Sequence, residues 1–186
     1  DRAYLLAGSV ALVFLLLLLA NYRAAQRWKA RLDRKELEFD MMRAELEPLG
    51  FKLEWLDMSA AGRAGHLVAT KKGKRGTKHL LLIAHLDTVF EPDSPFQKFV
   101  RKGNEAEGPG AGDDKGGMTV IVAALRAMQA AGTLKDANIE IHMTGDEEDA
   151  GDPIEVTRAP LIAAGKRADV SLDFEGLVRD EGRDMG

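Results

Sequence analysis

Apolar residues are spread unevenly along the chain, and their spacing changes after the first twenty residues. Residues 3–20, AYLLAGSVALVFLLLLLA, contain no charged side chain and show no polar face. Beyond them, apolar positions recur at the intervals that are typical of helices and strands. Near-helical spacing of Leu37, Met41, Met42 and Leu46 predicts a helix from about residue 26 to residue 47, ended by Pro48 and Gly50. We interpret the two methionines as packing residues.

The pattern then alternates between strands and helices. A short strand is expected at 51–58, and further strands at 65–72, 78–86, 137–145 and 168–176. The run at 78–86 is apolar on both faces, as in a central strand of a covered sheet. Helices are expected at 117–131, where Met118, Ile121, Val122, Leu125 and Met128 form one stripe, and at 152–165. This alternation predicts an α/β fold, a three-layer sandwich with a largely parallel central sheet.

The uncharged N-terminal run is long enough to cross a bilayer as a helix, which takes about 20 residues. A cleaved signal peptide needs small residues at Ala-x-Ala spacing, which Ala20, Ala24 and Ala25 do not provide. We therefore expect residues 1–22 to be a transmembrane anchor, with secretion after signal cleavage as the alternative. Residues 23–38 are expected to form a charged juxtamembrane helix, and residues 39–186 a folded domain.

Composition excludes several classes of function. The 186 residues include no cysteine, which rules out disulfides and thiolate metal sites, and the net charge of −4 gives no general case for nucleic-acid binding. The one basic run, at 71–78, contains Gly73 and Gly76 and no aromatic residue, so we interpret it as a solvated turn between two strands. We expect no nucleic-acid partner.

Polar side chains that can bind metal follow three of the predicted strands. His85 and Asp87 end the strand at 78–86, Asp146 to Glu148 follow the strand at 137–145, and Asp173 and Glu175 close the last strand. Ligands of α/β sheets gather at the carboxyl ends of parallel strands. These side chains are therefore expected to converge at one edge of the sheet.

A glycine-rich loop, GPGAGDDKGG at 108–117, precedes the helix expected at 117–131. Five glycines in ten residues allow close backbone approach, but the spacing of a phosphate-binding P-loop is absent, and acidic Asp113 and Asp114 stand where an anion would bind. Two carboxylates in such a loop suit a cation better. The acidic run GDEEDAGD at 145–152 would by itself be a solvated loop, but it follows a predicted strand end.

Imidazole and carboxylate groups without cysteine form a nitrogen and oxygen ligand set, for which Zn²⁺, Mn²⁺ and Co²⁺ are the candidate ions. Clustered carboxylates raise one another's pKa unless a cation compensates them. A pair of metals about 3.5–4 Å apart that share one carboxylate would compensate the cluster and form a hydrolytic site. Such chemistry also needs a carboxylate that binds no metal and transfers the proton.

The motifs HLD, GPGAGDDKGG, GDEEDAG and DFEG, in this order, resemble the co-catalytic zinc hydrolases of the glutamate carboxypeptidase, aminoacylase and succinyl-diaminopimelate desuccinylase family, over roughly residues 39–175. The resemblance implies two zinc ions and a zinc-exopeptidase-like fold, with Co²⁺ or Mn²⁺ as possible replacements. It implies that His85 binds one metal and Asp87 orients it, that Asp113 bridges both metals, and that Glu147 is the general base. Glu148 and Glu175 would each bind one metal.

Other polar residues are assigned no such role. His66, His79 and His142 lie in or at the start of strands and match no motif, so we expect them to be structural. Asp114 occupies a variable position of the loop and is left out of the ligand set. Asp173 is the alternative should Glu175 be misaligned.

The chain also departs from the family that it resembles. Family members have a further metal-binding histidine near the C-terminus and an inserted α/β domain for dimerisation and substrate binding. The sequence ends at Gly186, where that insertion would begin, so residues 39–186 are expected to be the N-terminal part of a truncated catalytic domain. We expect part of the sheet to be uncovered, and the 186 residues alone to show little activity.

The leading hypothesis is therefore a membrane-anchored metallopeptidase or N-acyl amino-acid deacylase that cleaves a C–N amide bond of a peptide or N-acyl amino acid, the full-length protein being a candidate homodimer. One alternative is a zinc aminopeptidase of the other co-catalytic class, against which the glycine-rich loop argues. Another is an inert, membrane-anchored fragment that binds metal. Arg23, Arg27, Lys29 and Arg31 favour a cytoplasmic domain by the positive-inside rule, whereas analogy with exported relatives favours an extracytoplasmic one, which we expect.

Overall fold

The computed structural model describes residues 16–23, 26, 36–90, 93–176, 178–180 and 183–185. Residues 36–46 are helical and run directly into the 3₁₀ turn η1 (Glu47–Leu49). The strands are β1 (Lys52–Leu56), β2 (His66–Lys71), β3 (His79–His85), β4 (Val100–Lys102), β5 (Glu105–Glu107), β6 (Asn138–Thr144), β7 (Val170–Asp173), β8 (Val178–Asp180) and β9 (Arg183–Met185). The labelled helices are α2 (Lys115–Ala130) and α3 (Ile154–Arg167), with 3₁₀ turns η2 (Ser59–Ala61) and η3 (Leu134–Asp136).

A five-stranded sheet in the order β1-β2-β6-β3-β7 forms the centre of the domain. Strands β6, β3 and β7 are mutually parallel, and β2 is antiparallel to both β6 and β1. Four of the five strands therefore run in one direction and β2 alone runs in the other, so the expected α/β fold with a largely parallel sheet is confirmed. Strand β6 lies between β2 and β3, and the basic turn passes its start, where Lys74 N–H donates to the Asp136 carbonyl at 3.1 Å.

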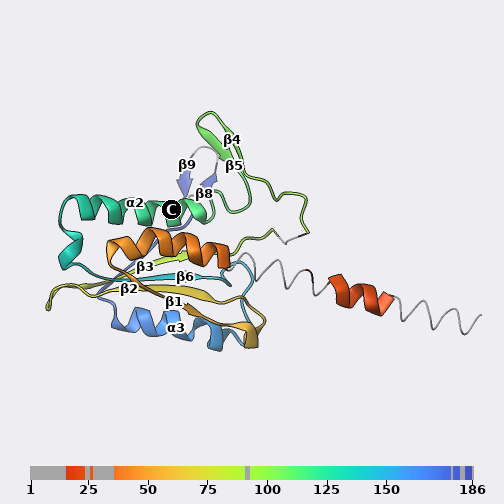
Figure 1. Ribbon diagram of the computed structural model, residues 1–186, viewed down its shortest axis with the longest axis horizontal. Helices are drawn as coiled ribbons and strands as arrows, with labels where there is room; N and C mark the ends of the chain where they lie inside the picture. The colour runs from red at the N-terminus through yellow and green to blue at the C-terminus, as the bar shows by residue number, and fades with distance from the viewer. Residues whose placement is uncertain are drawn as a thin grey trace, which may run out of the picture.

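Helices cover both faces of this sheet (Figure 1): the helix of residues 36–46 and α2 lie on one face, and α3 on the other. The apolar core lies between the sheet and the first pair of helices. Alternate residues of β6 and the predicted stripe of α2 meet there, and the buried members include Ile139, Ile141, Met143, Met118, Ile121 and Leu125. Val122 and Met128 pack against the same core, which confirms the stripe.

The helix of residues 36–46 packs on this core through a different face from the one that the sequence pattern suggested. Met42 and Leu46 are buried and Phe39 packs beside them, at intervals of three and four residues. Leu37 and Met41 lie on the outer side and are 61% and 60% exposed. The interpretation of both methionines as core residues was therefore wrong for Met41. Phe39 also makes an edge-to-face contact with Trp55 at 6.3 Å between ring centroids.

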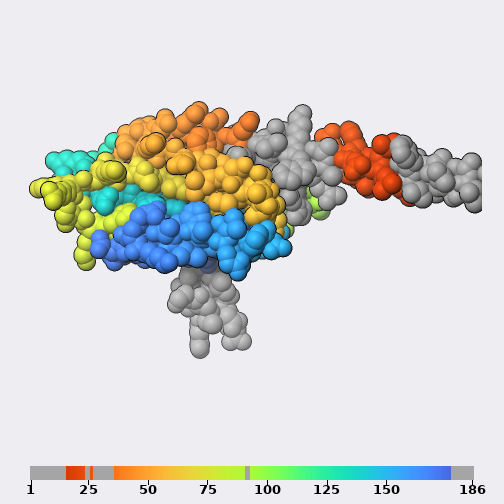
Figure 2. Space-filling model, turned by 90° about the horizontal axis from the view of Figure 1, so that it is seen from below, coloured from red at the N-terminus to blue at the C-terminus, as the bar shows by residue number. Residues whose placement is uncertain are grey.

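The face that α3 covers is much more polar. Figure 2 shows α3 (blue) lying lengthwise on this side of the molecule. Its buried residues are Thr157 and Ala164, and the sheet presents His66, Glu140 and His142 to it. His66 Nε2 contacts the Thr157 carbonyl at 2.9 Å, and Arg167 binds the Glu140 carboxylate. Hydrogen bonds and ion pairs, rather than apolar packing alone, therefore hold α3 on the sheet.

Most of the predicted membrane segment, residues 1–22, lies outside the described part of the chain. Its described part, residues 16–22, is helical and exposed, as is residue 23. Within the described ranges, no helix combines the length and the apolar content that crossing a membrane requires. Residues 27–35 of the predicted first helix are also outside the described part. The expected domain boundary at residue 38 falls inside the helix of residues 36–46, which belongs to the folded domain through Met42 and Leu46.

Two small hairpins were not predicted, β4–β5 and β8–β9. The sequences of β4 and β5, VRK and EAE, are three residues long and exposed at every position, so no alternation of apolar and polar residues marks them. Strand β7 forms one edge of the central sheet, and its Leu172 is 46% exposed.

Candidate metal centre

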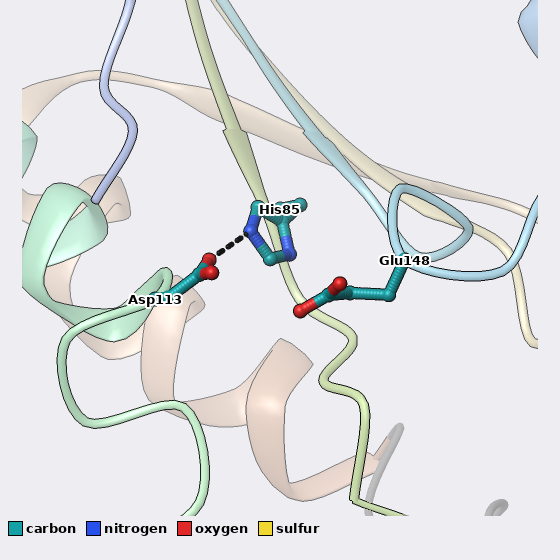
Figure 3. Close-up of side chains that lie close together, drawn as sticks. All are labelled: His85, Asp113 and Glu148. Carbon is teal, nitrogen blue, oxygen red and sulfur yellow. Dashed lines mark hydrogen bonds and ion pairs between the residues drawn. The ribbon is translucent and has the colours of Figure 1, made fainter. Parts of the chain in front are cut away.

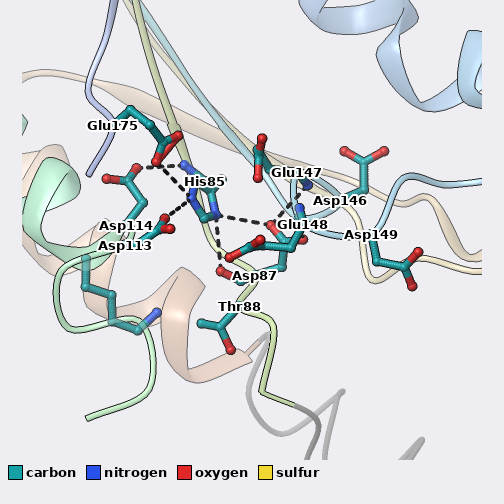
Figure 4. Close-up of polar contacts among 12 residues, drawn as sticks. His85, Asp87, Thr88, Asp113, Asp114, Asp146, Glu147, Glu148, Asp149 and Glu175 are labelled. Carbon is teal, nitrogen blue, oxygen red and sulfur yellow. Dashed lines mark hydrogen bonds and ion pairs between the residues drawn. The ribbon is translucent and has the colours of Figure 1, made fainter. Parts of the chain in front are cut away.

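Three adjacent parallel strands place their carboxyl ends side by side. In the order β6-β3-β7, His85 is the last residue of β3 and is in register with Thr144, the last residue of β6, and Asp173 ends β7. The loops that leave these ends contain Asp87, the acidic run 146–149 and Glu175, and Figure 4 shows them gathered around His85. The expected convergence at one sheet edge is confirmed.

His85 lies at the centre of this group, and its side chain is 2% exposed. Its Nδ1 atom lies 3.1 Å from the Asp87 carbonyl oxygen and 3.4 Å from Asp87 Oδ1. Its Nε2 atom lies 2.6 Å from Asp113 Oδ1 and 3.3 Å from Glu175 Oε1. One ring nitrogen thus faces Asp87, and the other faces the carboxylates of Asp113 and Glu175, both of which the resemblance identifies as metal ligands.

Asp113 enters the site from the glycine-rich loop that precedes α2. Its side chain is 59% exposed, and the peptide bond to Asp114 is cis. The neighbouring Lys115 turns away from the loop, and its Nζ lies 3.2 Å from Glu38 Oε1 on the helix of residues 36–46. Lys115 therefore forms an ion pair between helices, in agreement with the exclusion of a phosphate-binding loop.

Asp114 has a structural role that the sequence did not reveal. Its side chain is buried, and Oδ2 accepts the main-chain N–H of His85 at 2.9 Å. Burial raises the pKa of Asp114 to about 6, although the hydrogen bond from His85 opposes the shift. A Cβ atom on Gly117 would overlap Asp114 Oδ1 and the carbonyl oxygen of Phe174.

Asp87 connects the histidine to the acidic loop. Its Oδ1 accepts the main-chain N–H of Glu147 at 3.1 Å, and its Oδ2 accepts that of Glu148 at 3.0 Å. Burial by itself would raise the pKa of Asp87, but the hydrogen bonds from His85, Glu147 and Glu148 lower it below its ordinary value. Asp87 is thus an ionised group that orients both the imidazole and the following acidic loop.

Figure 3 shows three side chains whose potential ligand atoms lie close together. One atom each from His85, Asp113 and Glu148 lies within 4.8 Å of the other two. The pKa of Glu148 is raised, first by desolvation and then by the charge of Asp113, while the charge of His85 opposes the shift and Glu147 and Asp87 add smaller effects. Carboxylates that raise one another's pKa in this way are stabilised by a cation between them.

The environment of His85 tests whether this group fits a metal ion. Because Nδ1 faces the oxygens of Asp87, Nε2 directs its lone pair at Asp113 and Glu175, whose oxygens are also acceptors. This arrangement is favourable only with a cation between them, either a proton on Nε2 or a metal. Burial lowers the pKa of His85, but Asp87, Asp113 and Glu175 together raise it to about 10. The residues therefore fit a divalent cation with nitrogen and oxygen ligands.

The remaining sequence candidates lie around this group or apart from it. Glu147 is exposed beside Glu148, and Glu175 reaches His85 although 47% of its side chain is exposed. Asp146 is buried and Asp149 binds Arg63, so both turn away from His85 (Figure 4). Asp173 is exposed and lies in register with Ile83. His66, His79 and His142 bind main-chain groups or Glu140 within the α3 layer and lie apart from the group around His85.

Fold and site together define an α/β domain with a candidate metal centre at the ends of its parallel strands. Residues 81–184, more than half of the chain, match the family model described as Peptidase family M20/M25/M40. The chain belongs to this family.

Two curated relatives support the same assignment. Carboxypeptidase G2 from Pseudomonas sp. (strain RS-16) is 33% identical over 140 residues, which cover 73% of this chain and 32% of the relative. Succinyl-diaminopimelate desuccinylase from Novosphingobium aromaticivorans is 37% identical over 131 residues, which cover 67% of this chain and 32% of the relative. The chain thus spans about a third of the length of these relatives.

A solved structure shows the same fold. Human carnosine dipeptidase 1 superimposes with a TM-score of 0.61 at 18% identity, over 80% of this chain and 34% of that one. The α/β arrangement is therefore shared at an identity too low to support any conclusion about substrate.

Proposed function

We propose that this chain supplies the N-terminal part of the catalytic domain of a metal-dependent hydrolase that cleaves a C–N amide or peptide bond. The observation on which the proposal rests is the convergence of His85, Asp113 and Glu148 from three separate elements, with ligand atoms within 4.8 Å of one another. Membership of the peptidase family and the names of the relatives, a carboxypeptidase and a desuccinylase, support this reaction class.

The proposed ligands divide into two groups that share Asp113. His85 and Glu175 lie on one side, where His85 Nε2 is 2.6 Å from Asp113 and 3.3 Å from Glu175, and Glu148 lies on the other. Zn²⁺ is the proposed ion, with Co²⁺ or Mn²⁺ as alternatives, because the donors are one imidazole and several carboxylates. When bound there, such ions polarise a carbonyl and lower the pKa of a bound water.

Glu147 is the proposed general base. Its main-chain N–H is fixed by Asp87, yet its side chain is exposed at the rim of the cluster and is no part of the closest group of ligand atoms. A carboxylate beside the ligands that binds no metal itself can accept a proton from water and donate it to the leaving nitrogen.

Peptides and N-acyl amino acids are the proposed substrate class. The family and its relatives favour this class over the aminopeptidases of the other co-catalytic type. Because the chain spans about a third of the length of these relatives, activity and any homodimer belong in this proposal to a longer protein. The chain alone is expected to bind metal and to turn over little substrate.

Metal titration of the chain tests the proposal most directly. Isothermal calorimetry with Zn²⁺ or Co²⁺ should show binding that His85→Ala abolishes, while His79→Ala, at the other end of the same strand, leaves it intact. Hydrolysis of dipeptides and N-acyl amino acids by a longer protein that contains this chain should then depend on metal. Absence of binding to the wild-type chain would sink the assignment.

We also propose that residues 3–20 attach the protein to a membrane, with the domain on the extracytoplasmic side. The support is the uncharged run of these residues in the sequence. Extraction of membranes with alkaline carbonate should leave the protein in the pellet. A protease added to intact cells after permeabilisation of any outer envelope should then digest the domain, whereas a cytoplasmic domain would be protected.

A further inference from the structure

The loop of residues 145–151, between β6 and α3, holds both proposed functional glutamates and is hydrogen-bonded on two sides. On the side of the candidate metal centre, Asp87 accepts the N–H groups of Glu147 and Glu148. On the opposite side, toward α3, two arginines and a histidine bind the same loop. The role of Asp87 in orienting the proposed metal ligands explains the first set of contacts, but it does not explain those made by Arg63, His66 and Arg158.

Arg158 of α3 binds residue 146 at two points. Its Nη2 donates to the main-chain carbonyl of Asp146 at 2.9 Å, and its Nη1 lies 3.4 Å from the Asp146 carboxylate. The Asp146 side chain is fully buried, whereas that of Arg158 is 23% exposed. The other carboxylate oxygen of Asp146 accepts the N–H of Gly151 at 3.3 Å, which closes the loop on itself.

Two further residues hold the ends of the loop. Arg63 donates to the carbonyls of Asp149 and Ala150 at 2.6 and 2.9 Å. His66 accepts the N–H of Gly145 at Nδ1, 3.1 Å away, and donates from Nε2 to the Thr157 carbonyl at 2.9 Å, because an N–H and a carbonyl allow only that tautomer. The loop is therefore fixed at both ends and in the middle.

We propose that Arg158 is a positioning residue of the metal centre and acts through Asp146. Asp146 immediately precedes Glu147, so the position of its carbonyl sets the plane of the peptide bond that leads into Glu147, and Glu148 follows from the next peptide bond. The guanidinium donates a hydrogen bond to that carbonyl and forms an ion pair with the carboxylate, whose Oδ1 atom has no hydrogen bond of its own among the described residues. A planar group with several donors can make both contacts, whereas a single ammonium cannot. Asp87 then orients the next two N–H groups. The inference rests on the proposed function, because it concerns the same two glutamates.

A matched control lies on the same helix. Arg167 also binds a buried carboxylate of β6, that of Glu140, but Glu140 is near the start of the strand and away from the loop. Removing either arginine leaves a buried carboxylate without its cation and should destabilise the fold. Only removal of Arg158 should alter the geometry of Glu147 and Glu148.

The test is titration of the whole chain with Co²⁺ alone, followed by calorimetry and by the visible absorption of the bound ion. Arg158→Met should weaken Co²⁺ binding by about 10- to 100-fold, the range typical of residues that orient metal ligands, and should change the absorption spectrum. Arg167→Met should bind Co²⁺ as the wild type does. Equal losses in both variants, or none in Arg158→Met, would overturn the inference.

Two additions keep the test decisive. If Arg158→Met does not fold, Arg158→Lys retains the charge but loses the two-point contact, and it should still bind Co²⁺ several-fold more weakly, whereas wild-type affinity would refute the proposal. Amide hydrogen exchange of the metal-free chain gives a second readout, in which Glu147, Glu148 and Gly151 should exchange faster in Arg158→Met than in Arg167→Met. Equal exchange rates would refute it.

Wild-type protein that binds no Co²⁺ refutes the proposed function as well, whereas tight binding by both wild type and Arg158→Met refutes the inference alone.

Discussion

The Oδ2 atom of Asp87 lies 3.0 Å from the main-chain nitrogen of Glu148, so the segment after β3 is hydrogen-bonded to the loop after β6. The same carboxylate faces His85 Nδ1 at 3.4 Å through its Oδ1 atom. One ionised side chain thus orients two proposed ligands that are more than sixty positions apart in the sequence. Its removal should affect both.

We therefore expect Asp87→Ala to lower the affinity of the chain for Zn²⁺ by about 10- to 100-fold, the usual effect of removing a residue that orients ligands. Calorimetric titration measures the change. Asp93→Ala removes an exposed carboxylate from the adjoining loop and should leave affinity unchanged. A similar loss in both variants would mean that general negative charge, rather than orientation by Asp87, controls binding.

The two neighbouring glutamates should respond differently to the same change. Glu148→Gln removes a proposed ligand and should weaken metal binding, because a neutral amide replaces a carboxylate beside Asp113. Glu147→Gln should leave metal binding intact and lower kcat of a longer active protein by about 10²- to 10⁴-fold, as expected for loss of a general base. Metal content and turnover, measured on both variants, separate the roles. A reversed pattern would exchange the assignments.

The sequence predicted the parts of the molecule that burial and periodicity encode. The apolar residues of the run at 78–86 and of the stripe from Met118 to Met128 are buried or partly buried, as their patterns indicated. Apolar side chains that recur at a fixed interval must share a face. Parallel strands share an edge for their carboxyl ends, and the motifs at those ends therefore led to His85, Asp113 and Glu148.

Contacts between polar residues that are distant in the sequence could not be predicted in this way. Arg158 and Arg63 bind main-chain carbonyls, and no pattern of residue types records which carbonyl a side chain will reach. Asp114 looked like a variable loop residue because its burial depends on the close approach of Gly117. Helical spacing alone does not show which face of the helix of residues 36–46 is buried, because Leu37 and Met41 fit it as well as Met42 and Leu46 do. In the structure the buried face is the one that contains Phe39.

Gly117 should be one of the least replaceable residues of the glycine-rich loop. A Cβ atom there would overlap Asp114 Oδ1 and the Phe174 carbonyl, so Gly117→Ala should destabilise the fold by about 1–3 kcal/mol, as overpacking does. Its neighbour Gly116 also begins α2 but has only the Ala111 carbonyl within reach, at 3.6 Å. Gly116→Ala should be neutral or up to about 1 kcal/mol more stable, because alanine favours the helix. Urea denaturation of both variants measures the difference, and equal effects would contradict it.

Acid should destabilise the domain through the buried residues under α3. Titration of His142 should determine the pH at which the free energy of unfolding begins to fall. His142 Nε2 lies 2.8 Å from Glu140 Oε1, and its Nδ1 is buried without a partner in the described part of the chain. Burial lowers the pKa of His142 below its ordinary value of 6.5, because a proton on Nδ1 would have no acceptor, although Glu140 opposes the shift. Below pH 6.5 the unfolded chain therefore binds a proton that the folded chain does not, and stability falls by at most about 1.4 kcal/mol per pH unit.

Titration of Glu140 should extend the decrease in the free energy of unfolding to lower pH. Burial alone would raise the pKa of Glu140, but Arg167 and His142 lower it below 4.5, so its contribution to stability is present above pH 4.5 and is lost as pH falls through the lower, folded-state value. Urea denaturation at several pH values should show the decline in the wild type. In His142→Leu the part of the decline between pH 6.5 and pH 4.5 should be smaller, since the titrating group is gone and Arg167 still binds Glu140. At pH 8 His142 is neutral in both the folded and the unfolded chain. The difference in free energy of unfolding between the wild type and His142→Leu at that pH therefore measures the effect of the substitution on packing alone. An unchanged decline in the variant would show that other groups cause it.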